Sequence, residues 1–123
     1  MILPHRIRMT SEEELITSVY HSFNARDIDA VLAHMDPAVD WPNGMEGGRV
    51  HGHTEVRSYW ERQWKLVDPR VEPVHIAEDS SGHTVVDVYQ VIRDLDGAVL
   101  MDRMVQHVYT IRGQLITRMD IRE

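Results

Sequence analysis

The residue type best suited to chemistry in this sequence is a histidine within an apolar stretch. His107 lies in MVQHVYTI, where an imidazole can act as acid, as base or as hydrogen-bond donor to a developing oxyanion. We expect its pKa to lie near neutrality. Three roles stay open for His107: catalysis, contact with a ligand without catalysis, or a structural hydrogen bond to a neighbour. We take it as the first catalytic candidate.

The polar residues Gln90 and Arg103 are expected beside His107 on one face of a hairpin. The Asp-Gly pair in RDLDGAV is typical of a tight turn and sets the register of the strands on either side. That register pairs Gln90 with Arg103, Val86 with His107, and Arg93 with Leu100. A buried arginine needs an acidic partner or a ligand carboxylate, so both polar residues are candidate ligand contacts. Arg103 could instead reach the sheet edge and pair with Asp102 or with an acid on a helix. A bulge would exchange Gln90 for Asp87 and Tyr89.

A carboxylate and an aromatic ring follow one another in the stretch AVDW. Asp40 and Trp41 alternate across this predicted strand, so only one of them can face a cavity. If Asp40 pointed inward, apolar burial would raise its pKa and it could carry a proton. If it pointed outward, it would be a solvated or paired surface acid. We keep Asp40 as the second catalytic candidate and Trp41 as a candidate ligand contact.

Other aromatic side chains are candidates for the wall of a binding pocket. Tyr59, Trp60 and Trp64 recur at helical spacing and either present a flat wall to a cyclic ligand or belong to the core. We expect Trp60 to line the pocket. The remaining candidates for ligand contact are Tyr20, on the first predicted helix, and Tyr109, on the strand face of His107.

The glycine-rich stretch AVDWPNGMEGGRVHGHTEV, residues 38–56, contains two histidines. His51 and His53 suggest a metal site, but no clear third ligand accompanies them on the loop. We therefore predict no metal, and no pattern indicates an organic cofactor. The stretch itself is either the rim of a cavity or an ordinary glycine-rich connection.

Composition narrows the classes of partner. The 123 residues fit one domain, and 13 Lys and Arg against 20 Asp and Glu give a formal charge of −7, which disfavours nucleic acid and anionic membranes. Cysteine is absent, so thiolate chemistry and disulfides are excluded. The opening MILPHRIRM has too short an apolar run for a secretory signal, and no run is long enough to span a bilayer. We expect a cytoplasmic protein.

The predicted elements are helices first and strands last. A first helix is expected to begin at Thr10 or Ser11. A second is expected from about Asp27 to Met35, and a third from Thr54 to Val67. Pro69 would end the third helix. The short strand 38–41 precedes that helix, and beyond residue 70 the apolar period changes to that of four consecutive antiparallel strands, at 71–79, 84–94, 98–111 and 114–123. Both faces of these strands carry much apolar surface, so one face should pack on the helices and the other on a second copy in a homodimer.

This order resembles the nuclear transport factor 2-like superfamily, in particular its SnoaL-like and ketosteroid isomerase-like branches. The resemblance rests on FNARDIDAVLAHMDPAVDW, GHTEVRSYW and QHVYTIRGQLITRMDI, in that order over nearly the whole chain. It implies an α+β fold in a single domain, residues 1–123: a cone-shaped, curved antiparallel sheet wrapped by three N-terminal helices, with one mostly apolar cavity.

The catalytic groups of two activities known in the superfamily are not retained. Compared with the steroid isomerases, the tyrosine position falls on Val19, the base position on Trp41 and the acidic donor position on His107. Epoxide hydrolases of the superfamily use two aspartates and an arginine. Here Asp87 is present, but a valine and Ile121 stand at the other two positions. Neither activity is expected.

The sequence therefore predicts a protein that binds a small hydrophobic or cyclic organic molecule. The first hypothesis is an enzyme without cofactor that catalyses proton transfer, an isomerase, cyclase or hydrolase of a cyclic carbonyl-type substrate, with His107 as acid or base. The alternatives are a ligand-binding module without catalysis and a dimerising interaction domain.

Overall fold

The computed structural model describes residues 10–123, which form three helices and one sheet of six strands. The helices are Ser11–Asn24 (α1), Ile28–Leu32 (α2) and Gly52–Trp64 (α3). The strands are Met35–Pro42 (β1), Arg49–His51 (β2), Val67–Glu78 (β3), Thr84–Asp94 (β4), Val99–Arg112 (β5) and Leu115–Arg122 (β6). The expectation of no secretory signal concerns the opening segment MILPHRIRM, which lies outside the described residues.

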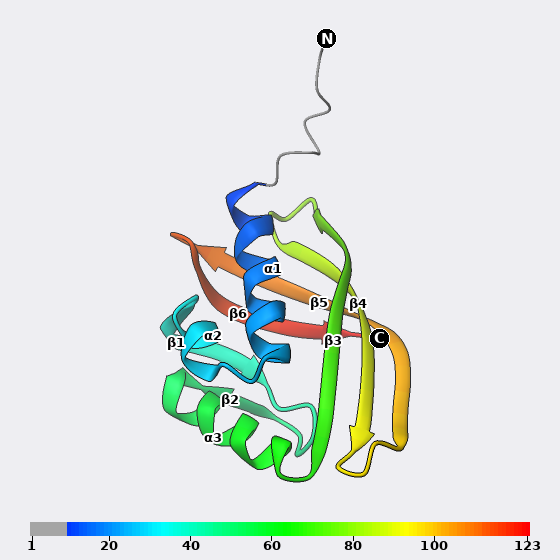
Figure 1. The fold of residues 1–123 in the computed structure, drawn as a ribbon. Coiled ribbons are helices and arrows are strands. Elements are labelled where there is room, and N and C mark those ends of the chain that lie inside the picture. Colours follow the sequence, from blue (N-terminus) through cyan, green and yellow to red (C-terminus); the bar gives the residue numbers. More distant parts are fainter. Residues whose placement is uncertain (1–9) are drawn as a thin grey trace.

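The sheet curls, and the helices lie against it. Its strand order is β2-β1-β6-β5-β4-β3. Figure 1 shows α1 lying across the curled sheet, with the shorter α2 and α3 beside β1 and β2. This architecture confirms the predicted α+β class with a curved sheet and three helices. One pair differs from the antiparallel expectation, because β1 and β6 run parallel.

The first helix begins as its sequence predicts. Thr10 accepts a hydrogen bond from the backbone of Glu13, whose side chain accepts one from the backbone of Thr10, so the two form a capping box. The apolar residues of α1 recur at helical spacing and are buried: Leu15, Ile16, Val19 and Tyr20. This face fixes which side chains α1 presents to the sheet.

The end of α3 and the start of β3 differ from expectation. The helix ends at Trp64 and does not reach Val67, which already belongs to β3. Pro69 lies inside β3 and so does not end the helix. A proline is tolerated there because β3 is an edge strand, where a missing backbone N–H need not interrupt the ladder.

The strand β1 is longer than expected and has a short partner. It spans residues 35–42 and pairs with β2, residues 49–51, which the sequence analysis did not predict. The ladder between β1 and β6 is irregular between Met35 and Asp40, and Pro37 falls within this interruption. The second helix accordingly ends at Leu32, before the predicted Met35.

The register of the β4–β5 hairpin is confirmed where it bears on the cavity. Gln90 opposes Arg103 and Val86 opposes His107. Arg93 opposes Val99, so its predicted pairing with Leu100 was wrong by one residue. The cause is a bulge between Ile92 and Arg93, next to the turn. Because the bulge lies beyond Gln90, it leaves the inward face of the hairpin unchanged.

The core lies between the helices and the inner face of the sheet. Its most deeply buried large side chains are Trp60, Tyr109, Ile16, Met35 and Ile116. None of the helices formed by residues 10–123 is long and apolar enough to cross a membrane.

Candidate functional site

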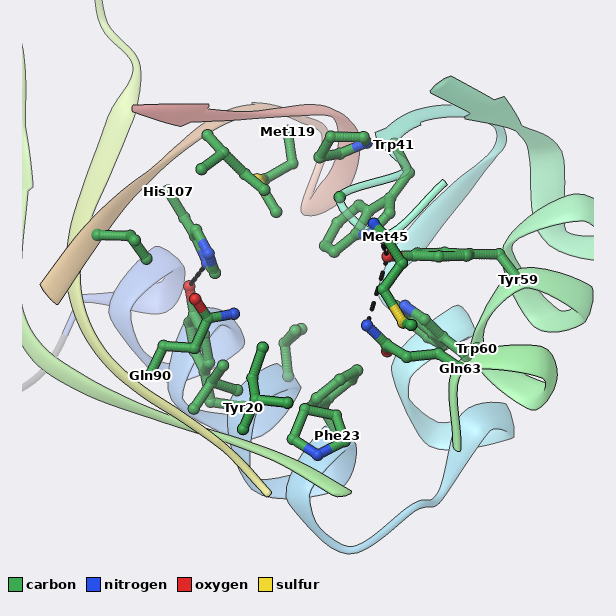
Figure 2. A pocket seen from close by; sticks show the side chains of 18 of the residues that line it. Tyr20, Phe23, Trp41, Met45, Tyr59, Trp60, Gln63, Gln90, His107 and Met119 are labelled. Atoms are coloured by element: carbon green, nitrogen blue, oxygen red, sulfur yellow. Dashed lines mark hydrogen bonds between the residues drawn. The ribbon is translucent and has the colours of Figure 1, made fainter. Parts of the chain in front are cut away.

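A cavity of about 150 Å³ opens between the helices and the inner face of the sheet. It is lined from α1, α2 and α3, from β1 and the loop after it, and from β3, β4, β5 and β6. Figure 2 shows His107 and Tyr20 on one side of this cavity, and Trp41, Tyr59 and Trp60 on the opposite side. The predicted ligand contacts therefore gather around one space.

Aromatic rings form one wall of the cavity. The rings of Trp41 and Trp60 meet edge to face with centroids 5.7 Å apart, and the ring of Phe23 meets Trp60 in the same way at 5.3 Å. Trp64 is not a lining residue; it stacks behind Trp60 at 6.0 Å. Such a wall favours a flat ring system, because aromatic groups pack well in stacked and edge-on arrangements.

Three residues form a buried hydrogen-bond chain on the opposite side. The hydroxyl of Tyr109 donates to Tyr20 Oη at 2.8 Å, and Tyr20 Oη lies 2.7 Å from His107 Nδ1. The three side chains come from α1 and from alternate positions of β5, and each is less than one-tenth exposed. We call this set the hydrogen-bond chain. Tyr20 thus reaches the cavity, although it lies one residue beyond the position that the steroid isomerases use.

We assign the tautomer of His107 from the order of donors in the hydrogen-bond chain. Because Tyr109 donates to Tyr20, the hydroxyl proton of Tyr20 is free to be donated to Nδ1. The reverse order would leave the unpaired proton on Tyr109, which is 1% exposed, whereas this order leaves it on His107, which is 7% exposed and lines the cavity. In this assignment His107 carries its proton on Nε2, as a neutral imidazole whose N–H is left for another partner.

Burial changes the ionisation of all three groups. It lowers the pKa of His107 from 6.5 to about 4, so the expectation of a near-neutral pKa was wrong. Burial also raises the pKa of Tyr20 and of Tyr109 well above their usual value. At neutral pH the hydrogen-bond chain is uncharged, and polarised hydrogen bonds strengthen one another in such surroundings.

Asp40 does not face the cavity. Its carboxylate pairs with Arg49 and with Nη1 of Arg118 at 2.7 Å, on the outer face of β1. Trp41, the next residue, points inward and is 7% exposed. The expectation that Asp40 might carry a proton in the cavity is therefore corrected, because strand alternation admits only one of the two residues.

Gln90 and Arg103 line the cavity from adjacent strands. Gln90 is half-buried, whereas the side chain of Arg103 is 42% exposed and pairs with Oε1 of Glu123. The alternative that a bulge would turn Asp87 inward is corrected too: Asp87 accepts a hydrogen bond from Gln106 at 2.8 Å and does not line the cavity.

Tyr59 was among the candidates for the pocket wall, whereas the polar lining residue Gln63 was missed as a site candidate. Tyr59 and Gln63 lie one turn apart on α3, and Gln63 Nε2 donates to Tyr59 Oη at 3.4 Å. Gln63 Oε1 is buried and has no hydrogen-bond partner among residues 10–123. The signal was available, because residues 59, 60 and 63 share the apolar face of the predicted helix.

The loop after β1 forms part of the rim, as one of the two interpretations predicted. Gly44 and Met45 of this loop line the cavity, together with Pro42, the last residue of β1. The loop is held by Glu46, which accepts a hydrogen bond from the side chain of Asn43 at 2.8 Å and pairs with Arg62 at 2.9 Å. These contacts attach the loop to α3.

The two histidines near this loop do not come together as metal ligands. His53 Nε2 lies 2.9 Å from the carbonyl oxygen of Met35, and His51 is exposed near Asp40. Within residues 10–123, no three His, Asp or Glu side chains gather as a metal site would require.

A curled sheet with three helices around a mostly apolar cavity is the architecture of nuclear transport factor 2-like proteins. Residues 16–119 match the SnoaL-like domain. The chain belongs to this family. Curated protein sequences give no match.

Solved structures share the fold over almost the whole chain. TerC, co-crystallised with polyporic acid, is 27% identical, with 91% of this chain and 90% of TerC covered and a TM-score of 0.79. A nuclear transport factor 2-like protein from Burkholderia pseudomallei is 24% identical (92% and 90% covered, TM-score 0.80). A candidate polyketide cyclase from Sinorhizobium meliloti is 18% identical (93% and 100% covered, TM-score 0.75). The last two show the fold alone.

Proposed function

We propose that the chain binds a flat, cyclic organic molecule in its cavity and polarises a carbonyl group of that molecule with His107 Nε2–H. The observation that carries this proposal is the hydrogen-bond chain, which ends in an uncommitted N–H on a buried neutral imidazole. The aromatic wall opposite matches a ring system. The similarity to TerC, which was co-crystallised with polyporic acid, supports a cyclic ligand of this kind.

The chemistry that this arrangement favours is removal of a proton next to the carbonyl, as an isomerase or cyclase requires. Electron density moves to the carbonyl oxygen as the C–H bond breaks, and the hydrogen bond from Nε2 strengthens as that charge grows. A neutral imidazole can stabilise an enolate in this way. In this proposal His107 is a hydrogen-bond donor and keeps its proton, in place of the acid or base role expected from the sequence.

The proton acceptor in this proposal is water. None of the described residues that line the cavity is Asp, Glu or Lys. The substrate C–H must then be acidified by the ring or by a second carbonyl group, and the proton leaves to water at the mouth. Substrates of this kind are cyclic ketones and polyketide-like diketones.

The test is hydrogen–deuterium exchange at C1 of 2-tetralone in D₂O, followed by NMR. We expect the wild-type protein to accelerate exchange. His107→Asn should reduce the acceleration of exchange about a hundredfold, which is the usual contribution of one oxyanion donor. His21→Asn, at an exposed position of α1, is the matched control and should have no effect. Exchange that is unaffected by His107→Asn would contradict the assigned role. Binding without exchange would favour the ligand-binding module.

We further infer a homodimer through the outer face of the sheet. Tyr89 and Met104 oppose one another on that face and are 37% and 52% exposed, and Leu100 farther along β5 is 61% exposed. Exposed large apolar side chains on neighbouring strands indicate a protein contact. A second copy of this chain is the occupant that we propose.

A further inference from the structure

The inner wall of β5 changes in polarity from the closed end of the cavity to its mouth. His107, at the closed end, is 7% exposed, and Val105 is buried. Arg103, at the mouth, has a side chain 42% exposed. These alternate residues share one strand face, and four positions correspond to about 13 Å of extended strand. The wall thus offers a neutral N–H inside, an apolar middle and a cation at the rim.

The neighbouring strand repeats this gradient. In β4 the residues opposite His107 and Val105 are the buried Val86 and Val88, and the residue opposite Arg103 is the amide Gln90. Among the described residues that line the cavity, Arg103 is the one with a full charge. A ligand that spans the wall therefore meets positive charge only where it leaves the cavity.

Arg103 already holds a carboxylate. Its Nη1 lies 2.5 Å from Oε1 of Glu123, whose side chain is 68% exposed. A guanidinium binds carboxylates well because its planar N–H groups match the two oxygens. The acidic protein, with a formal charge of −7, repels anionic ligands at long range, so an acid would need such a local cation to bind at the mouth.

We propose that Arg103 is an anion subsite at the cavity mouth and that the carboxylate of Glu123 is an internal competitor, which the acidic group of a ligand displaces. This inference rests on the proposed function. It narrows the ligand class to cyclic carbonyl compounds with a carboxylate at the end remote from the carbonyl group. The carbonyl binds His107 inside, and the carboxylate binds Arg103 outside.

The experiment compares two probes that differ in charge alone: 6-acetyl-2-naphthoic acid and its amide, 6-acetyl-2-naphthamide. Affinities are measured by isothermal titration calorimetry. We expect Glu123→Gln to strengthen binding of the acid about threefold, since an exposed ion pair contributes this order of free energy. Binding of the amide should not change. Arg103→Gln should weaken binding of the acid about threefold or more, and in that background Glu123→Gln should no longer strengthen it.

Glu72→Gln is the matched control. Glu72 forms an exposed ion pair with Arg70, with the two side chains 2.7 Å apart, and neither residue lines the cavity. Glu72→Gln changes the net charge by the same amount as Glu123→Gln. Glu72→Gln should leave the affinity for the acid unchanged. If it strengthens binding of the acid as much as Glu123→Gln does, the effect is one of net charge and the subsite is overturned.

The two proposals fail differently. If the amide binds, and neither Arg103→Gln nor Glu123→Gln changes the affinity for the acid, the anion subsite is overturned and the proposed function stands. If neither probe binds wild-type protein or any variant, the proposed function is contradicted, and the subsite falls with it.

Discussion

Protonation of the buried His107 should make the protein less stable in mild acid. In the unfolded chain this imidazole has its ordinary pKa of 6.5, whereas burial lowers the pKa in the folded protein to about 4. As the pH falls below 6.5, the unfolded chain takes up a proton that the folded protein refuses. The free energy of unfolding therefore falls until the pH passes about 4, and below that this group adds no further loss.

The size of the effect follows from the two pKa values. Their difference corresponds to about 3 kcal/mol in total, of which about 2 kcal/mol is lost between neutral pH and about pH 5. Hydrogen bonds from arginines lower the pKa of Glu46 and of Asp120, and the contribution of such carboxylates is removed by comparison with a variant. His107→Asn is suitable, because an amide oxygen can accept the hydrogen bond from Tyr20 but does not titrate.

The assay is urea unfolding followed by tryptophan fluorescence, near pH 7 and near pH 5, at one fixed protein concentration. Wild-type protein should lose about 2 kcal/mol more than His107→Asn over this interval. His21→Asn, which removes an exposed histidine, should behave as the wild type does. Equal losses in wild type and His107→Asn would refute the reasoning, since they would mean that His107 titrates alike in both states.

Three further perturbations test other parts of the structure. Tyr20→Phe leaves the other two members of the hydrogen-bond chain without their partner, so urea unfolding should show a loss of about 1 to 3 kcal/mol. Asp40→Asn should lower the free energy of unfolding by about 1 kcal/mol, because two arginines lose their carboxylate partner. Ligand affinity measured by calorimetry should not change, and a weaker affinity would contradict the outward position of Asp40. Tyr89→Lys should convert the proposed dimer to monomers in size-exclusion chromatography with light scattering, and an unchanged mass would count against that interface.

Much of the fold was predictable because its signals are local. The apolar period of α1 and the alternation in β4 and β5 reflect faces that each element buries on its own. The Asp-Gly turn then placed Gln90 opposite Arg103. The bulge beside Arg93 and the three-residue strand β2 have no comparable signal, because each is set by contacts with neighbouring strands.

The candidate site was predictable in its membership and less so in its chemistry. The sequence indicated that His107 faces inward, but Tyr20 and His107 are 87 residues apart, and no local pattern reveals their hydrogen bond. The low pKa of His107 follows from the depth of its burial, a property of the assembled molecule. The outward position of Asp40 was one of two alternatives that strand alternation left open.

The position of β6 in the sheet has a consequence for how the protein folds. This strand, the last along the chain, lies between β1 and β5, and its parallel pairing joins Asp40 to Arg118, 78 residues apart. Closing so long a loop is entropically costly and slows folding. Trp41 and Met119, from these two strands, both line the cavity. We expect the binding space to be among the last parts of the molecule to form, so a ligand should stabilise the assembled sheet.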